Sequence, residues 1–349
     1  MGMKKNLLLT LIAGSLVLNT FATVRTVSNH PAGGSQYSTL QNAYDAANDG
    51  DTLLIEGSTV AYQSPSVWVK LLVVIGPGIK TIKQGFHRAE LEFFVMGTGG
   101  GGSKFYGIKL QAIEINQNVN GLIFEDCLFD YYLYLGTSNN NNITNITVKN
   151  CIFSTSHESI YSSSNTISNL LITNCLFNGS VSLAVITNNP VNTIIDHCVF
   201  LWGTIEKLSN SVVKNCVFYN VDPVFYFGNN VLNCDFSNNI CRLASTLPGP
   251  NNFGSGNLTN TNPNFVNVPF NTYYSLTKTF NFNLLPGSLG IGTANDGSDI
   301  GVHGGFANTF TEEFEPKVTP IIRVVQLQNN IVGPNGSINI EIQAGKPAQ

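Results

Sequence analysis

The sequence predicts an all-β solenoid, a fold in which one short supersecondary unit is stacked on copies of itself. A four-residue motif recurs through the middle of the chain, and its cysteines lie 24, 24, 23, 18 and 18 residues apart. Repeats of such a period are typical of solenoids, in which each unit contacts only its neighbours. The copies are Asp126–Phe129, Asn150–Phe153, Asn174–Phe177, His197–Phe200, Asn215–Phe218 and Asn233–Phe236.

The apolar pattern within one unit predicts a corner next to the cysteine. Positions five and three before the cysteine, the cysteine itself and the Phe two residues after it are mostly apolar. In one straight strand, the cysteine would point away from the third residue before it, so the chain must bend between them. The residue at the bend is usually Asn, which tolerates a left-handed backbone and can hydrogen-bond from one unit to the next. These ladder residues are Asn150, Asn174, Asn215 and Asn233.

The cysteines are expected to be free although the chain looks exported. Equivalent positions on stacked strands lie about 4.8 Å apart with parallel Cβ vectors, whereas a disulfide needs Cβ atoms about 3.8 Å apart that point toward each other. We therefore expect a column of buried thiols beside a column of Phe rings. Cys241 is out of register and is the expected exposed or paired thiol. The two columns comprise Cys127, Cys151, Cys175, Cys198, Cys216 and Cys234, and Phe129, Phe153, Phe177, Phe200, Phe218 and Phe236.

Residues 1–22 read as an export signal. Lys4 and Lys5 precede a short apolar run, and Thr20-Phe21-Ala22 has the form of a cleavage site. The run is too short to span a bilayer as a helix, so we expect cleavage near Ala22, a secreted or cell-surface protein and no membrane insertion. Charged residues make up only 11% of the chain, and a net charge of −4 without a basic cluster argues against nucleic acid as a partner.

The rest of the chain divides into four predicted segments. Ser38 starts a capping-box pattern, and apolar residues follow at helical spacing from Leu40 to Ala47, so a short helix is expected to cover the first turn. The segments are an N-terminal cap (23–50), the solenoid (51–260), a terminal rung and coil (261–310) and a C-terminal β-hairpin segment (311–349).

Two outward-facing columns are unexpectedly aliphatic. They occupy the positions four before and one after each cysteine, as in Ile123 and Leu128. Bare columns of this kind would form a larger apolar patch than soluble monomers usually expose. We therefore expect residues 311–349 to cover one of them.

The chain resembles the right-handed parallel β-helix (pectin-lyase-like) family over residues 36–305. The marks are the Gly50-Asp51-Thr52 entry after the helix, the Asn-Cys-x-Phe rungs, and the exit from Pro263-x-Phe265-Val266 to Asp299-Ile300-Gly301. The tail resembles segments of surface proteins of Bacteroidetes-type bacteria. The resemblance implies a single-stranded right-handed parallel β-helix. Its members include lyases, hydrolases, adhesins and binding proteins, so it implies an extracellular polysaccharide partner without selecting one activity.

The resemblance also implies where catalytic groups would lie. Lyases of this fold hold Ca²⁺ with acidic side chains and use Arg or Lys as a base, and related hydrolases use clustered acids. On the third side of the rungs, Glu158, Glu206 and Asp222 are the candidate catalytic residues. Carboxylates about 5–10 Å apart suit glycoside hydrolysis, and hard oxygen ligands also suit Ca²⁺. No cofactor other than this conditional Ca²⁺ is indicated.

Aromatic residues on the same side form a candidate sugar platform, because rings stack on the apolar faces of sugars. Scarce charge and the lack of a converging Asp/Arg/Lys set favour non-catalytic glycan binding or surface adhesion. A polysaccharide lyase or glycoside hydrolase and a structural surface element remain the alternatives, and the sequence does not indicate an oligomeric state. The candidate substrate-binding residues are Tyr132, Tyr134, Tyr161, Trp202 and Tyr226.

Overall fold

A computed structural model describes most of the chain. Residues 1–21 lie outside the described part, so the export signal stays a prediction. No helix among the described residues is both long and apolar enough to cross a membrane. The described residues are 22–30, 34–79, 87–136, 142–154, 158–162, 166–182, 192–203, 205–220, 231–269, 280–305, 310, 321–327 and 340–345.

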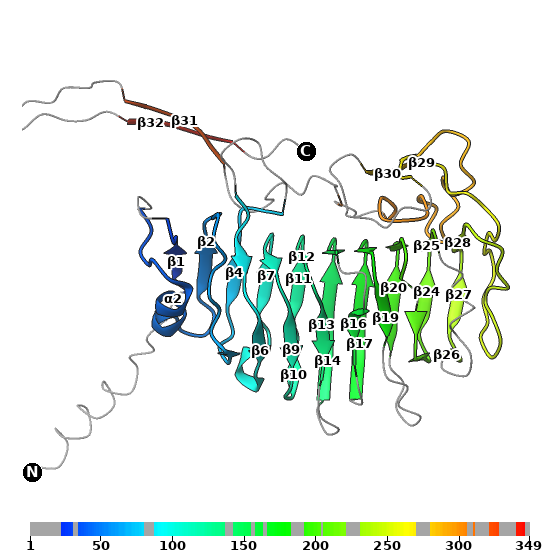
Figure 1. Cartoon of the computed structure of the whole chain (residues 1–349), viewed down its shortest axis with the longest axis horizontal. Coiled ribbons are helices and arrows are strands. Elements are labelled where there is room, and N and C mark those ends of the chain that lie inside the picture. Colours follow the sequence, from blue (N-terminus) through cyan, green and yellow to red (C-terminus); the bar gives the residue numbers. More distant parts are fainter. Residues whose placement is uncertain are drawn as a thin grey trace, which may run out of the picture.

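The chain folds into an all-β parallel solenoid, the fold class that the repeat predicts and that the family resemblance specifies as a right-handed β-helix. Three parallel sheets, here called A, B and C, run along the long axis of the molecule, and each turn of chain contributes a strand to each sheet in succession (Figure 1). Strand pairing is in register from turn to turn, so equivalent residues form columns. Because alternate residues point into the interior of the solenoid, one continuous apolar core fills its length.

The strand bounds follow the three sheets. Sheet A contains β1 (Val24–Val27), β2 (Thr52–Ile55), β4 (Val73–Ile75), β7 (Lys104–Tyr106), β10 (Val119–Asn120), β11 (Ile123–Glu125), β14 (Asn142–Lys149), β17 (Thr166–Thr173), β20 (Thr193–Asp196), β24 (Val212–Lys214) and β27 (Asp235–Ser237). Sheet B contains β5 (Glu90–Leu91), β8 (Lys109–Leu110), β12 (Leu128–Phe129), β15 (Ile152–Phe153), β18 (Leu176–Phe177), β21 (Val199–Phe200), β25 (Val217–Phe218) and β28 (Ile240–Cys241). Sheet C contains β3 (Val67–Trp68), β6 (Phe94–Met96), β9 (Ile113–Ile115), β13 (Leu133–Leu135), β16 (Glu158–Tyr161), β19 (Ser180–Ser182) and β22 (Ile205–Glu206).

Short elements complete the inventory. The remaining strands form three two-stranded sheets. Of these, β31 and β32 form the predicted C-terminal hairpin, in which each strand pairs with the other. The elements are η1 (Thr98–Gly100), β23 (Leu208–Ser209) with β26 (Val231–Leu232), β29 (Phe265–Asn267) with β30 (Asn281–Leu284), and β31 (Ile321–Leu327) with β32 (Ile340–Gly345).

A short helix covers the N-terminal end of the solenoid, as predicted. Helix α2 (Leu40–Ala46) starts at Thr39, one residue after the predicted cap, and the Thr39 hydroxyl accepts a hydrogen bond from the Asn42 amide. Tyr44 packs on the Trp68 ring with centroids 5.0 Å apart. The segment is more than a cap, however, because β1 precedes the helix and pairs with β2. The solenoid therefore begins before residue 51.

The corner residues adopt the left-handed conformation that the sequence predicts. Asn150, Asn174 and Asn215 have φ of 52°, 52° and 55°, and Asp126 and His197 adopt the same conformation at 56° and 49°. Asp126 and His197, which replace Asn at this position, thus adopt the same backbone conformation as the Asn residues. The Asn150 amide donates to the Asp126 carboxylate at 3.1 Å, so the expected bonding between rungs is present there.

Five of the six predicted rungs build the Cys and Phe columns. All seven cysteines are free and buried, and the thiols from Cys127 to Cys216 bond to main-chain groups rather than to each other as disulfides. The five rings from Phe129 to Phe218 stack with centroids 4.6, 4.8, 4.9 and 5.1 Å apart. Such contacts add about 0.5–1.5 kcal/mol each beyond burial.

The sixth copy of the motif does not belong to these columns. Phe236 pairs with Val213 in sheet A, and the rung in register with Phe218 places Cys241 at the Phe position. Cys241 is fully buried, so the expectation that it is exposed or paired is wrong. Asn239 occupies the Cys position, and its side chain accepts a hydrogen bond from the Cys216 amide at 2.9 Å.

Asn233 instead belongs to a second column of left-handed corners at the start of sheet A. This column includes Asn145, Asn169 and Asn210, with φ of 56°, 56° and 48°. Asn169 donates to Asn145 at 3.0 Å, and Asn233 donates to Asn210 at 2.6 Å. The corner next to the cysteine column and the corner before sheet A thus both prefer Asn. For this reason the sixth copy of the motif has the sequence of the first corner but lies at the second.

The strap, defined here as the described residues 261–269, 280–305 and 310, covers the outer face of sheet B. A second apolar cluster joins the outward aliphatic column to the strap. The covering residues that the structure describes therefore precede the predicted 311–349. The side chains of 311–349 lie outside the described part, so that expectation stays a prediction. The outward column of sheet A stays partly exposed, with Ile194 at 41%. The cluster includes Leu128, Leu176, Val199, Val217 and Ile240 of the column, and Phe265, Val268, Phe282, Ala294, Ile300, Val302 and Phe310 of the strap.

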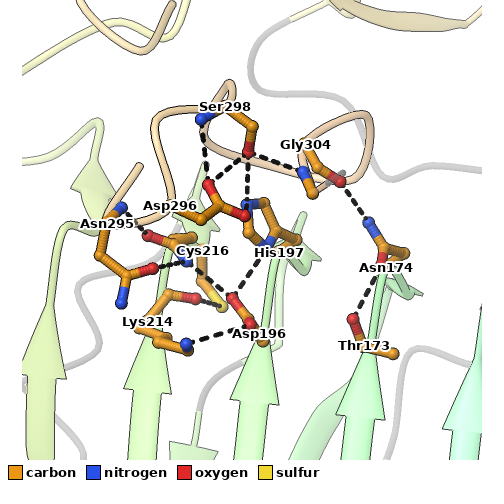
Figure 2. Close-up of polar contacts among 12 residues, drawn as sticks. Thr173, Asn174, Asp196, His197, Lys214, Cys216, Asn295, Asp296, Ser298 and Gly304 are labelled. Atoms are coloured by element: carbon orange, nitrogen blue, oxygen red, sulfur yellow. Dashed lines mark hydrogen bonds and ion pairs between the residues drawn. The ribbon is translucent and has the colours of Figure 1, made fainter. Parts of the chain in front are cut away.

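The corner column fastens the strap (Figure 2). The Asn174 amide donates to the carbonyls of Val302 and Gly304 at 3.0 and 2.9 Å. The Asn215 amide donates to Asn295 at 2.8 Å and accepts from its backbone N–H at 2.9 Å. A Cβ at Gly304 would lie 2.3 Å from the His197 ring and 1.8 Å from a carbonyl, so only glycine allows this approach.

Candidate functional site

The outer face of sheet C carries three of the four predicted tyrosines in one place. The register aligns Glu114, Tyr134, Tyr161, Ser182 and Glu206 on five successive strands. Their neighbours in each strand, such as Leu133 and Ile160, point inward and are fully buried. Strand alternation therefore presents this polar and aromatic column on the outside of the solenoid.

Three tyrosines pack together on this face. The Tyr134 and Tyr161 rings stack with centroids 4.2 Å apart, and Tyr132 meets Tyr161 edge-on at 5.3 Å. All three side chains are half-buried. Burial raises the pKa of Tyr132 and of Tyr161, and the negative charge of Glu114 raises both pKa values further, whereas the hydrogen bond with Tyr161 partly lowers that of Tyr132. The Tyr132 and Tyr161 phenols are therefore neutral and can donate hydrogen bonds across the physiological pH range.

Glu114 holds Tyr132 in place and was not singled out in the sequence. The Tyr132 hydroxyl donates to one carboxylate oxygen of Glu114 at 3.2 Å, and the Asn116 amide donates to the other at 3.4 Å. The rung of Glu114 lacks the cysteine motif, with Ile108 at its place, so its register could not be extended from the repeat. The alternation Ile113-Glu114-Ile115 was the one available signal.

Glu158 and Glu206 lie on this face but not in one column. Glu158 pairs with Ser180, whereas Glu206 pairs with Ser182, which is the partner of Tyr161. Tyr161, not Glu158, is therefore the equivalent of Glu206. Burial raises the pKa of Glu206, and the negative charge of Glu158 raises it further against the opposing effect of Lys207. The two carboxylates thus influence each other from strands two apart.

The other predicted site residues are not brought to this cluster by the described part. Asp222 and Tyr226 lie outside the described residues. Trp202 is half-buried and packs against the apolar cluster beneath the strap, so it serves the covered face of sheet B. The described platform is therefore Tyr132, Tyr134 and Tyr161.

A charged cluster on sheet B was also missed as a unit. Lys109 bridges Glu90 and Asp130 at 2.8 and 2.6 Å. Burial opposes both charges, but the ion pairs prevail: they lower the pKa of Glu90 and raise that of Lys109. A general acid or base needs a pKa near the working pH. This cluster therefore holds fixed charges and is not arranged for proton transfer.

The contacts of His197 resemble a nucleophilic triad only superficially. Its Nδ1 lies 2.7 Å from Asp196, and its Nε2 lies 3.1 Å from the Ser298 hydroxyl (Figure 2). However, Ser298 donates its proton to Asp296 at 2.6 Å and accepts from the Gly305 amide at 2.7 Å. With its lone pairs and proton engaged, this hydroxyl fastens the strap and is not arranged as a nucleophile.

The described residues contain no group of three or more His, Cys, Asp or Glu side chains that could hold a metal ion.

Comparisons with known proteins add little about activity. No protein-family model and no curated protein matches the chain. Among solved structures, the chain is similar to the crystal structure of the pectate lyase Pel9A, with 12% sequence identity and a TM-score of 0.44, over 81% of this chain and 96% of that one. At these values the similarity says nothing about a ligand, and the description of the fold rests on the strand register.

Proposed function

We propose that this protein binds polysaccharide through the outer face of sheet C. The observation that carries the proposal is the contact between Tyr132, Tyr134 and Tyr161, which gathers three half-buried phenols on one face. Aromatic rings offer apolar surface to the C–H faces of sugars, and phenolic hydroxyls offer hydrogen bonds to sugar hydroxyls. A parallel β-helix also presents its outer columns along a straight line, which suits an extended chain ligand.

The arrangement of the rings indicates how a sugar would approach. One face of Tyr161 is covered by Tyr134, and its opposite face is turned toward the strand of Ser182. Ser182 and Glu206 continue the column on that side. A pyranose stacked on this face of Tyr161 would lie within reach of a carboxylate and of phenolic hydroxyls.

The test is glycan binding by the full chain and by Tyr161→Ala, measured by affinity electrophoresis through a series of soluble polysaccharides. We expect retardation by at least one polysaccharide and a loss of roughly tenfold or more in affinity in Tyr161→Ala, since one stacked ring contributes on the order of 1–2 kcal/mol. Tyr131→Ala is the matched control, because Tyr131 is 59% exposed and belongs to no ring contact of the cluster. Equal affinity of the three proteins would contradict the proposal.

Glycoside hydrolysis is the second candidate, favoured by the raised pKa of Glu206. A raised pKa is the direction of shift that a general acid requires. Glu158 is two strands away, a backbone separation of about 10 Å or more. That backbone separation suits the wider carboxylate spacing of an inverting enzyme better than the close pair of a retaining one.

Reducing-end release from any polysaccharide that the protein binds tests this second candidate. Turnover that disappears in Glu206→Gln while binding persists would favour the hydrolase. Binding without turnover in the unmodified protein would leave the binding function alone.

A further inference from the structure

We infer that the sheet C face selects glycans that carry amino groups over polyuronates, with Glu158 and Glu206 as the selecting residues. The inference rests on the proposed function and adds the class of ligand. It starts from the pairing of carboxylates on the three outer faces.

Several carboxylates of sheets A and B have a cationic partner, although Asp235 of sheet A accepts a hydrogen bond from the Ser237 hydroxyl instead. Lys149 pairs with Glu125 at 3.1 Å, and Lys214 pairs with Asp196 at 3.4 Å. On sheet B, Lys109 serves both of its acidic neighbours. In these places the fold neutralises acidic columns with its own lysines, as stacked parallel strands allow.

Glu158 and Glu206 on sheet C differ from these ion-paired carboxylates. Neither carboxylate makes a hydrogen bond or an ion pair with the described part of the chain, although both are half-buried. Lys207 is exposed and adjacent to Glu206, and it partly offsets the charge there without forming an ion pair. The third acid of the face, Glu114, is already engaged by Tyr132 and Asn116.

The chemistry of a fitting ligand follows from this imbalance. Two carboxylates that repel each other beside an aromatic cluster favour a ligand with an apolar ring face and a cationic substituent. A 2-amino sugar offers both, because its ammonium group can donate to a carboxylate while its ring stacks on a tyrosine. A polyuronate would bring its own carboxylates next to Glu158 and Glu206, and the like charges would repel each other.

The experiment compares three soluble oligosaccharides of matched length by isothermal titration calorimetry in low salt at about pH 6. The probes are glucosamine oligomers, their N-acetylated counterparts and oligogalacturonate. We expect the glucosamine oligomer to bind roughly threefold to tenfold more tightly than the N-acetylated one, as partly exposed ion pairs give. The preference should shrink as salt is added.

Glu158→Gln with Glu206→Gln is the decisive variant, because it keeps shape and removes charge. It should bind both amino and N-acetyl oligomers with similar affinity. Glu125→Gln is the control, since that acid belongs to sheet A and is paired with Lys149. Its preference should equal that of the unmodified protein.

The outcomes separate the inference from the proposed function. Binding of the N-acetylated oligomer with no preference for the amino form, or tighter binding of oligogalacturonate, would overturn the inference and leave glycan binding intact. No binding of any probe, in a protein that also ignores the wider polysaccharide series, would overturn both.

Discussion

The outer faces of sheets B and C come from the same turns of chain but differ in what covers them. On sheet B, the outward column is aliphatic and the strap buries it, with Val199 and Val217 fully inaccessible. On sheet C, the outward column carries tyrosines and carboxylates, and the strap cluster contains no residue of that sheet. The outer columns of one solenoid can thus differ in chemistry, one buried by the chain itself and one left for the binding role that we propose.

The largest expected effect comes from breaking the covered face. Val302→Asp places a charge where the side chain is 1% exposed against the sheet B column, and we expect a loss of more than about 3 kcal/mol in the free energy of unfolding. Glu206→Gln on sheet C should change it by less than about 0.5 kcal/mol. Urea denaturation of both variants makes the comparison. Equal stability of the two would mean that the strap does not seal sheet B.

Removal of the hydrogen bonds between the corner column and the strap should cause a smaller loss in the free energy of unfolding. Asn174→Ala removes two hydrogen bonds to strap carbonyls, and we expect a cost of about 1–3 kcal/mol. Asn169→Ala is a matched control, since its φ of 56° is close to the 52° of Asn174 but its amide bonds to Asn145 outside the strap. Thermal denaturation of the pair isolates the contribution of the strap. An equal cost for both variants would show that only the left-handed corner matters.

The corner that holds the strap, at the end of sheet A, should also differ from the sheet C face in its response to pH. Burial opposes ionisation of Asp196, but His197, Asn215 and Lys214 outweigh it and lower the pKa of this carboxyl. A lowered folded-state pKa gives stability that is present above the unfolded pKa of about 3.9 and is lost as pH falls through the folded value. Acid denaturation of Asp196→Asn should therefore be less steep than that of the unmodified protein.

The contribution of Glu206 to stability depends on pH in the opposite direction, because the pKa of this carboxyl group is raised. Its contribution is favourable below the unfolded pKa of about 4.3 and declines as pH rises through the folded value. Glu206→Gln should therefore gain slightly in stability relative to the unmodified protein above that range. Chemical denaturation at a series of pH values compares the slopes of the two variants, and slopes of the same sign would contradict the assignment.

The sequence was sufficient for the repeated rungs and insufficient where repeats vary in length. The corner, the thiol column and the ring stack from Phe129 to Phe218 follow from residue types at fixed spacing. The sixth copy misled because a second corner uses the same Asn, and only strand pairing distinguishes the two. The local sequence of a left-handed corner is the same whether the corner precedes or follows a strand.

The site was predicted in part for the same reason. The third side has no fixed length, so Glu158 was given the register that Tyr161 occupies. Tyrosines on that side could still be selected by residue type, and the structure brings three of them together. Glu114 and the cover of sheet B depend on contacts between distant segments, which no local pattern reports.

The most direct test of the account is hydroxyl-radical footprinting of the full chain with and without a saturating bound polysaccharide, read by mass spectrometry. The account predicts protection of Tyr132, Tyr134 and Tyr161, with no change at Tyr219, which is already buried beneath the strap. Protection confined to the outer faces of sheets A or B, with the three tyrosines unchanged, would contradict it.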